Sequence, residues 1–157
     1  MRRAHFAVAG VLALVALGLS TSPTSADTVS PEISYALSAV PGGEIVDTDT
    51  AYWPELGMTL TLPNANARSA GAASAIGSCP NGSVCAFKGA ALTGAMLSWT
   101  TCTTHSTAAL GSSPRSIADA RSTGYLQARR GATVVATAWA QSWNNVTATS
   151  TSIRCVL

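Results

Sequence analysis

The sequence predicts a mostly β protein: a small two-sheet sandwich preceded by a short segment of one helix and one hairpin. Three observations lead to this fold class. Short apolar strand candidates follow one another between turn residues at intervals of about ten residues, which is typical of an antiparallel sandwich. A clear helical period occurs at only one place after the N-terminal leader. Four cysteines, all in the second half, are suited to two disulfides in an exported chain.

Residues 1–26 have the three parts of an export signal peptide. Arg2 and Arg3 precede an apolar run over residues 6–19, and small residues at 24–26 predict cleavage after Ala26. The apolar run is too short to favour a spanning helix, and no second run follows. The sequence therefore predicts a secreted, extracellular protein with no stable membrane anchor after signal cleavage.

Residues 27–62 predict a helix followed by a β-hairpin. Ser30-Pro31-Glu32 combines an N-cap, a proline at the first helical position and an acid in the first turn. Apolar residues at 33, 36, 37 and 40 then repeat with helical spacing until Pro41-Gly42-Gly43. Strands are expected over 44–53 and 58–62. Such a small unit is not stable alone, so we expect it to pack on the rest of the chain.

Residues 63–78 contain almost no large side chains, which predicts a linker to a disulfide-bonded β module over residues 79–157. Strands of the module are expected over 84–88, 95–101, 116–121, 124–129, 133–139, 146–149 and 152–156. Aromatic residues should supply most of the bulk of its core. The expected large core residues are Phe87, Trp99, Tyr125, Trp139 and Trp143.

Charges divide sharply near residue 68. Residues 27–68 carry six acidic residues against one arginine, and residues 69–157 carry six basic residues against one acid. One interpretation is that solvated side chains cluster by chance, and the other is that the acidic segment docks on the basic module. The basic excess is too modest to predict a nucleic-acid partner.

Few side chains are available for chemistry, so we expect no enzyme, no cofactor and no metal site. His105 is the only histidine after the signal peptide, and we expect it to be solvated in a loop rich in Thr and Ser. A Ser-His-Asp set would need His105 and Asp119, but no nucleophile elbow is recognisable. The module has no second acid for a carboxylate pair, and no His/Cys/Glu cluster remains once the thiols are oxidised.

The four cysteines are Cys79, Cys85, Cys102 and Cys155, and they allow three disulfide pairings. We favour Cys79–Cys85, because this short separation suits a turn. The second bridge would then be Cys102–Cys155, which would tie a central strand to the last strand.

A protein that inhibits a peptidase needs a rigid loop, because a loop ordered in advance loses little entropy on binding. Two loops next to cysteines qualify: the ring closed by Cys79 and Cys85, and the polar loop 100–114. Alternatively, the disulfides only staple a small sandwich with a marginal core. The candidate inhibitory residues are Pro80, Asn81, Gly82, Ser83 and Val84 in the ring, and Thr103, Thr104 and His105 in the loop.

A family resemblance begins at Cys79. The run Cys79-Pro80-x-Gly82-x-x-Cys85-x-Phe87, followed by Gly94, Leu97, Trp99 and Cys102, resembles secreted actinobacterial proteins of the peptidase inhibitor I36 family. The resemblance implies a β/γ-crystallin-like Greek-key fold, in which an aromatic residue and a glycine stand seven residues apart, as Phe87 and Gly94 do. It also implies inhibition of metalloproteinases. The position of crystallin-type calcium ligands, residues 111–116, carries no carboxylate or amide here.

The sequence thus predicts a secreted peptidase inhibitor whose partner is an extracellular protease. The alternative is a non-catalytic binding or structural module at the cell surface or on cell-wall glycan. Exposed Trp or Tyr side chains would favour this alternative.

Overall fold

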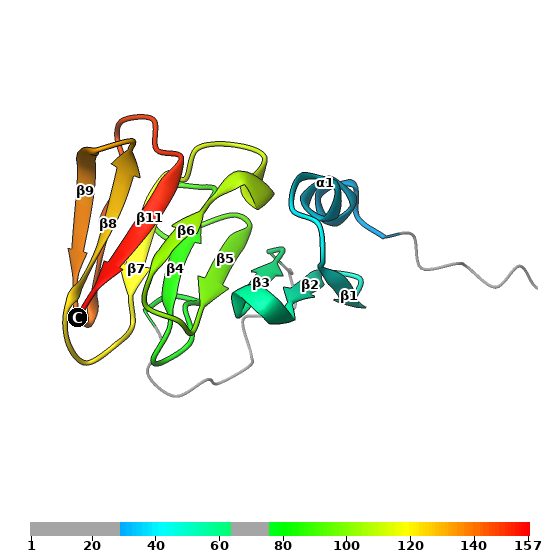
Figure 1. Cartoon of the computed structure of the whole chain (residues 1–157), viewed down its shortest axis with the longest axis horizontal. Coiled ribbons are helices and arrows are strands. Elements are labelled where there is room, and N and C mark those ends of the chain that lie inside the picture. The colour runs from blue at the N-terminus through cyan, green and yellow to red at the C-terminus, as the bar shows by residue number, and fades with distance from the viewer. Residues whose placement is uncertain (1–28, 64–75) are drawn as a thin grey trace, which may run out of the picture.

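The computed structural model describes residues 29–63 and 76–157. The expected signal peptide and most of the expected linker lie outside these residues. The described chain forms two antiparallel sheets, of seven and four strands, with one short α-helix (Figure 1). This architecture confirms the mostly β fold class. Within the two described ranges, no helix is long and apolar enough to cross a bilayer.

The seven-stranded sheet has the order β1-β2-β3-β5-β4-β7-β10, and the four-stranded sheet has the order β6-β11-β8-β9. The elements in chain order are α1 (Pro31–Ala39), β1 (Glu44–Asp47), β2 (Thr50–Trp53), the 3₁₀ turn η1 (Pro54–Leu56), β3 (Met58–Thr61), β4 (Val84–Phe87), β5 (Met96–Trp99), β6 (Thr104–Ser106), the 3₁₀ turn η3 (Ala108–Leu110), β7 (Ser116–Asp119), β8 (Tyr125–Arg130), β9 (Thr133–Trp139), β10 (Ser142–Asn145) and β11 (Ser152–Val156).

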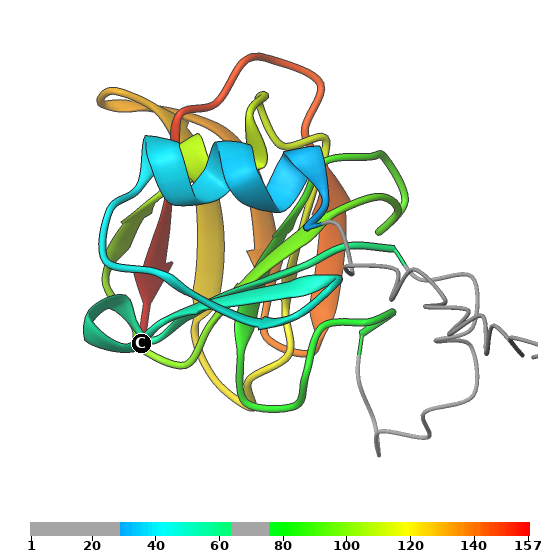
Figure 2. The same cartoon turned by 90° about the vertical axis from the view of Figure 1, so that its right-hand side faces the viewer.

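Helix α1 begins and ends where its capping signals predict. The Ser30 hydroxyl accepts a hydrogen bond from the Glu32 N–H at 3.2 Å, and Pro31 occupies the first turn. Its buried residues are Ile33 and Ala36, on the face that the apolar spacing predicts. The helix lies across one end of the sandwich (Figure 2).

The segment expected to be one strand, 44–53, is two strands joined by a tight turn. The Asp47 carboxylate accepts a hydrogen bond from the Asp49 N–H at 2.8 Å, which closes the turn between β1 and β2. A short acidic side chain favours such turns because it bonds to the backbone two residues on. The prediction of one continuous strand here was wrong.

The N-terminal segment joins the rest of the protein through a backbone ladder. Strand β3 pairs antiparallel with β5, in a register that sets Met58 against Trp99 and Thr61 against Met96. The main apolar core contains residues from both parts, including Trp53 and Leu60 together with Leu97 and Ile117. The expected packing of this segment is confirmed.

Charge contributes less to this joint than the charge division suggests. Among the described residues, the one ion pair between the N-terminal segment and the module joins Lys88 to Glu32, and both side chains are partly exposed. Exposed ion pairs contribute at most about 1 kcal/mol. The joint therefore depends on the β3–β5 ladder and on the shared core.

Two apolar clusters lie on opposite faces of the seven-stranded sheet. The main core fills the space between the two sheets. A smaller cluster covers the other face around the Cys79–Cys85 disulfide, and includes Phe87, Met96 and Ala118. All residues of β4, β5 and β7 are consequently buried.

The aromatic residues divide between core and surface in a way the sequence analysis did not predict. Phe87 and Trp99 are buried as expected, and Trp53 is a third large core residue. Trp139 and Trp143 are 66% and 42% exposed, so their assignment to the core was wrong. They lie on β9 and β10, the outermost strands of their sheets, each of which pairs with one strand only.

Two strands of the module also differ from expectation. The strand predicted over residues 146–149 lies earlier, at β10, and all four of its residues are exposed and mostly polar. Strand β6 was expected to be loop, because its sequence is Thr-His-Ser. Both strands form by pairing, β10 with β7 and β6 with β11, and not through an apolar alternation of their own.

Both favoured disulfide pairings are confirmed. Cys79 pairs with Cys85, and Cys102 pairs with Cys155. The Cys79–Cys85 disulfide closes a short ring that ends within β4. The Cys102–Cys155 disulfide ties the segment before β6 to the last strand, β11.

We predict that Trp53→Ala lowers the free energy of unfolding by about 3–5 kcal/mol. The indole fills the joint between helix and sheet, donates to the Val40 carbonyl oxygen at 2.7 Å and packs against Gly43. Urea unfolding followed by circular dichroism measures the loss. Trp143→Ala is the matched control, and half-exposed Trp143 should cost about 1 kcal/mol or less. Equal losses for the two variants would contradict the assignment of Trp53 to the core.

We predict that removing Cys102–Cys155 destabilises the protein by about 2 kcal/mol more than removing Cys79–Cys85. The bridges span sequence separations of 53 and 6 residues, and loop entropy in the unfolded chain grows with the logarithm of the loop length. Paired Cys→Ala variants, unfolded in urea, test this difference. A larger loss from the short ring would mean that packing of its sulfurs in the smaller cluster outweighs chain entropy.

Candidate recognition surfaces

The Cys79–Cys85 ring presents a small, firmly held turn. The Ser83 N–H donates to the Pro80 carbonyl oxygen at 3.1 Å, and Gly82 has a φ of +78°, which is typical of a type II turn. Beneath the turn, Ala120 bonds to both Gly82 and Ser83 through its backbone. The ring is therefore anchored to the end of β7.

Only part of the ring is accessible. Pro80, Asn81 and Gly82 are exposed, whereas Ser83 and Val84 are buried. Ser83 and Val84 therefore do not belong to the exposed loop in which the sequence analysis placed them, because they continue the pairing of β4 with β7.

The second candidate loop contains a buried histidine. His105 is only 7% exposed, its ring stacks on Trp99 with centroids 4.9 Å apart, and its Nε2 lies 2.9 Å from the Thr101 carbonyl oxygen. The prediction of a solvated loop histidine was wrong, because β6 turns this side chain towards the sandwich interior. Burial lowers the pKa of His105, and the hydrogen bond to Thr101 opposes this shift.

Thr103 and Thr104 remain exposed beside this buried histidine. The Cys155 N–H donates to the Thr103 carbonyl oxygen at 2.9 Å, and the Thr107 N–H donates to the Thr151 carbonyl oxygen at 3.3 Å. In an antiparallel pair, every second residue bonds to the neighbouring strand. The backbone groups of Thr104 and Ser106 therefore point away from β11, towards the outer edge of the sheet.

The structure does not bring the two candidate loops into one site. The ring stands beside the seven-stranded sheet, and Thr103–His105 belong to the edge of the four-stranded sheet. A buried ion pair lies beside the Cys102–Cys155 disulfide: the Arg121 guanidinium holds the Asp119 carboxylate at 2.6 Å and reaches Cys102 Sγ at 2.9 Å. Asp119 is thus bound to Arg121, and His105 to Thr101. Within the described ranges, no group of three metal-binding side chains occurs.

An aromatic pair, an exposed tryptophan beside a half-buried tyrosine, lies towards the other edge of the four-stranded sheet. Tyr125 of β8 and Trp139 of β9 are cross-strand partners, and their rings meet edge to face with centroids 5.3 Å apart. Both were expected in the core from the sequence. A signal against this was present, because Tyr125 alternates with the buried residues Leu126 and Ala128 and shares its face with Gln127.

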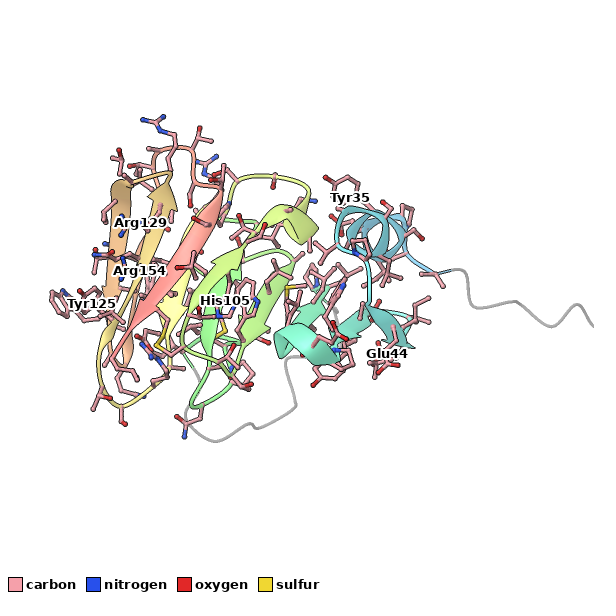
Figure 3. The ribbon with its side chains drawn as sticks, in the orientation of Figure 1. Tyr35, Glu44, His105, Tyr125, Arg129 and Arg154 are labelled. Atoms are coloured by element: carbon pink, nitrogen blue, oxygen red, sulfur yellow. A yellow bond between two sulfur atoms is a disulfide. The ribbon has the colours of Figure 1, made fainter. Side chains whose placement is uncertain are left out.

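Charge is separated along the molecule. The strands of the four-stranded sheet contain Arg129, Arg130 and Arg154 and no acidic residue. The acidic strand β1, with Glu44 and Asp47, lies at the opposite end (Figures 1 and 3). The division near residue 68 thus becomes a spatial one.

No protein-family model matches the chain, and neither a curated protein nor a solved structure matches it. The relation to the peptidase inhibitor family stays a prediction from the sequence.

We predict that the free energy of unfolding decreases as the pH falls from about 7.5 to about 5.5. The pKa of His105 is lowered in the folded state, so the unfolded chain takes up a proton first as the pH falls through 6.5. Urea unfolding of the chain from residue 27, whose one histidine is His105, measures this slope. His105→Gln should flatten it, and an unchanged slope would assign the pH dependence to other groups.

Proposed function

We propose that the protein is an extracellular peptidase inhibitor that presents the outer edge of β6 to its target. The observation that carries this proposal is an exposed edge strand next to a disulfide. Peptidases bind chain segments in extended form, and an extended strand edge offers the backbone N–H and C=O groups that such pairing uses. Thr104 and Ser106 offer these groups here.

Three interactions hold this edge in place. The Cys102–Cys155 disulfide fixes the chain just before it, and the pairing with β11 fixes its inner side. The His105 ring stacks on Trp99 and bonds to the Thr101 carbonyl oxygen, so it holds the turn between β5 and β6. A segment ordered in advance loses little conformational entropy when it binds, which is the physical requirement for tight inhibition.

The chain path supports the crystallin-like fold that the family resemblance implies. Among the four consecutive strands from β4 to β7, the fourth, β7, returns to pair with the first, β4. The third strand, β6, belongs to the other sheet. In β8–β11, β11 likewise returns beside β8, while β10 crosses to the first sheet. The return of a fourth strand beside the first is the Greek-key connection.

The Phe87–Gly94 spacing, part of the resemblance, also has a structural counterpart. Phe87 ends β4 in the smaller cluster, and Gly94 has a φ of +79° in the β4–β5 hairpin, where a side chain would be strained. The Ser116 hydroxyl ties this hairpin to β7, because it donates to the Gly89 carbonyl oxygen at 2.7 Å and accepts from the Leu92 N–H at 3.0 Å.

We predict stoichiometric inhibition of at least one peptidase in a panel of thermolysin-type and subtilisin-type enzymes. Thr104→Pro removes the outward N–H of the edge without removing a ladder bond to β11. It should therefore weaken inhibition about tenfold, the loss expected for one main-chain hydrogen bond. Thr104→Ala keeps the backbone and should inhibit within about threefold of the parent. Residual peptidase activity at increasing inhibitor concentration gives both constants.

Asn81→Ala is the control for the alternative loop and should inhibit as the parent does. If Asn81→Ala abolishes inhibition and Thr104→Pro does not, the disulfide ring is the inhibitory segment. Circular dichroism establishes that each variant is folded. Failure of the folded parent to inhibit any peptidase in the panel would overturn the proposed function.

A second candidate is a non-catalytic binding module at the cell surface or cell wall. The exposure of Trp139, in contact with Tyr125, favours it. An exposed tryptophan on a regular strand forgoes a large hydrophobic gain, and such aromatic residues are enriched where proteins bind partners.

A further inference from the structure

We propose that the outer face of the four-stranded sheet binds a polysaccharide that carries carboxylate groups. The contact would centre on Trp139 and Arg154. This inference names the ligand class of the binding-module candidate and rests on that candidate alone. Peptidase inhibition uses the outward backbone groups of β6, whereas this contact uses side chains of β8, β9 and β11, so each can fail without the other.

The strand register places the relevant side chains on one face. Leu126 and Ala128 of β8 point into the core, so Tyr125, Gln127 and Arg129 point outward. Across the ladder, Trp139 is the partner of Tyr125, and Arg154 is the partner of Gln127. An aromatic row and a basic row thus lie two residues apart on the outer face of the sheet.

The aromatic row can take up a sugar ring. Trp139 is 66% exposed, and its contact with Tyr125 restrains the indole. The C–H groups on one face of a pyranose are apolar, and they can stack on an indole face that has no protein cover. A restrained ring needs little further ordering, so more of the stacking energy contributes to binding.

The basic row can take up a carboxylate. The guanidinium of Arg129 is already held by Gln127 Oε1 at 2.8 Å and by the Ala132 carbonyl oxygen at 2.7 Å. Arg154 is exposed, and its side chain has no hydrogen bond or ion pair within the described part of the chain. A guanidinium matches a carboxylate with two parallel hydrogen bonds, which makes Arg154 the expected contact.

The rest of the face agrees with this ligand better than with other anions. No acidic residue lies on these four strands to repel a carboxylate. Gln127 and Thr137, in the same row as Arg154, and Ser152, in the next row, provide amide and hydroxyl groups for sugar hydroxyls. Three arginines are few for nucleic acid, whose binding depends on many phosphate contacts.

Polygalacturonate and its fully methyl-esterified form are a matched pair of probes, because they share a sugar backbone and differ in charge. We expect the folded chain from residue 27 to bind polygalacturonate at least tenfold more tightly than the ester in isothermal titration calorimetry at about 0.1 M salt. Trp139→Ala and Arg154→Gln should each weaken binding about tenfold. Arg154→Lys should restore part of it, since a lysine keeps the charge but loses the fork of donors.

Trp143→Ala and Arg115→Gln are the matched controls. Trp143 is the other exposed tryptophan, and it shares a register row with Ala118 on the outer face of the seven-stranded sheet. Arg115 is exposed and precedes β7. Both control variants should bind polygalacturonate as the parent does.

Four outcomes would overturn the proposal: no binding of polygalacturonate, equal binding of its ester, equal binding of polyglutamate, or no effect of Trp139→Ala and Arg154→Gln. Equal binding of polyglutamate would reduce the surface to a general polyanion site, without a role for the aromatic row. Tighter binding to vesicles of anionic lipid would assign the face to a membrane instead. Trp139→Ala should inhibit peptidases as the parent does, which keeps this test separate from that of the proposed function.

Discussion

The backbone ladder between β3 and β5 is the interaction on which the rest of the structure depends. It turns a helix and hairpin that are too small to fold alone into the outer part of a seven-stranded sheet. It also gives β5 a partner on its outer side, where the edge of the module would otherwise be unpaired. Trp53 of β2 then bonds to the Val40 carbonyl oxygen at the end of α1. The main core is one continuous cluster that extends from α1 to β11.

The elements with strong local signals could be predicted from the sequence. Helix α1 follows from its capping residues, and β4 and β5 follow from compact apolar runs that are buried on both faces. Strands β6 and β10 could not be predicted, because their sequences are polar and they form only through neighbours distant in the chain. Whether a histidine or tryptophan side chain is buried or exposed depends in the same way on where its strand lies in the sheet.

The candidate site was predictable only in part. The cysteines and Thr103–Thr104 could be chosen as candidates from the sequence, because the cysteine spacing and the polar composition of the loop can be recognised there. The orientation of the Thr104 backbone is not visible, because it is set by the ladder with β11. The face that holds Tyr125 could have been read from its alternation with Leu126 and Ala128, but the expectation that aromatics fill the core took precedence.

The separation of charge between the two ends of the molecule has a consequence for how it would meet a charged layer. A body with arginines at one end and carboxylates at the other has a permanent electric dipole, and a dipole turns in a field before contact. Near an anionic polymer, the four-stranded sheet would face inward and β1 would face the medium. The outer surface of such a coating would then carry the carboxylates of β1, so the layer would present an acidic exterior to the medium.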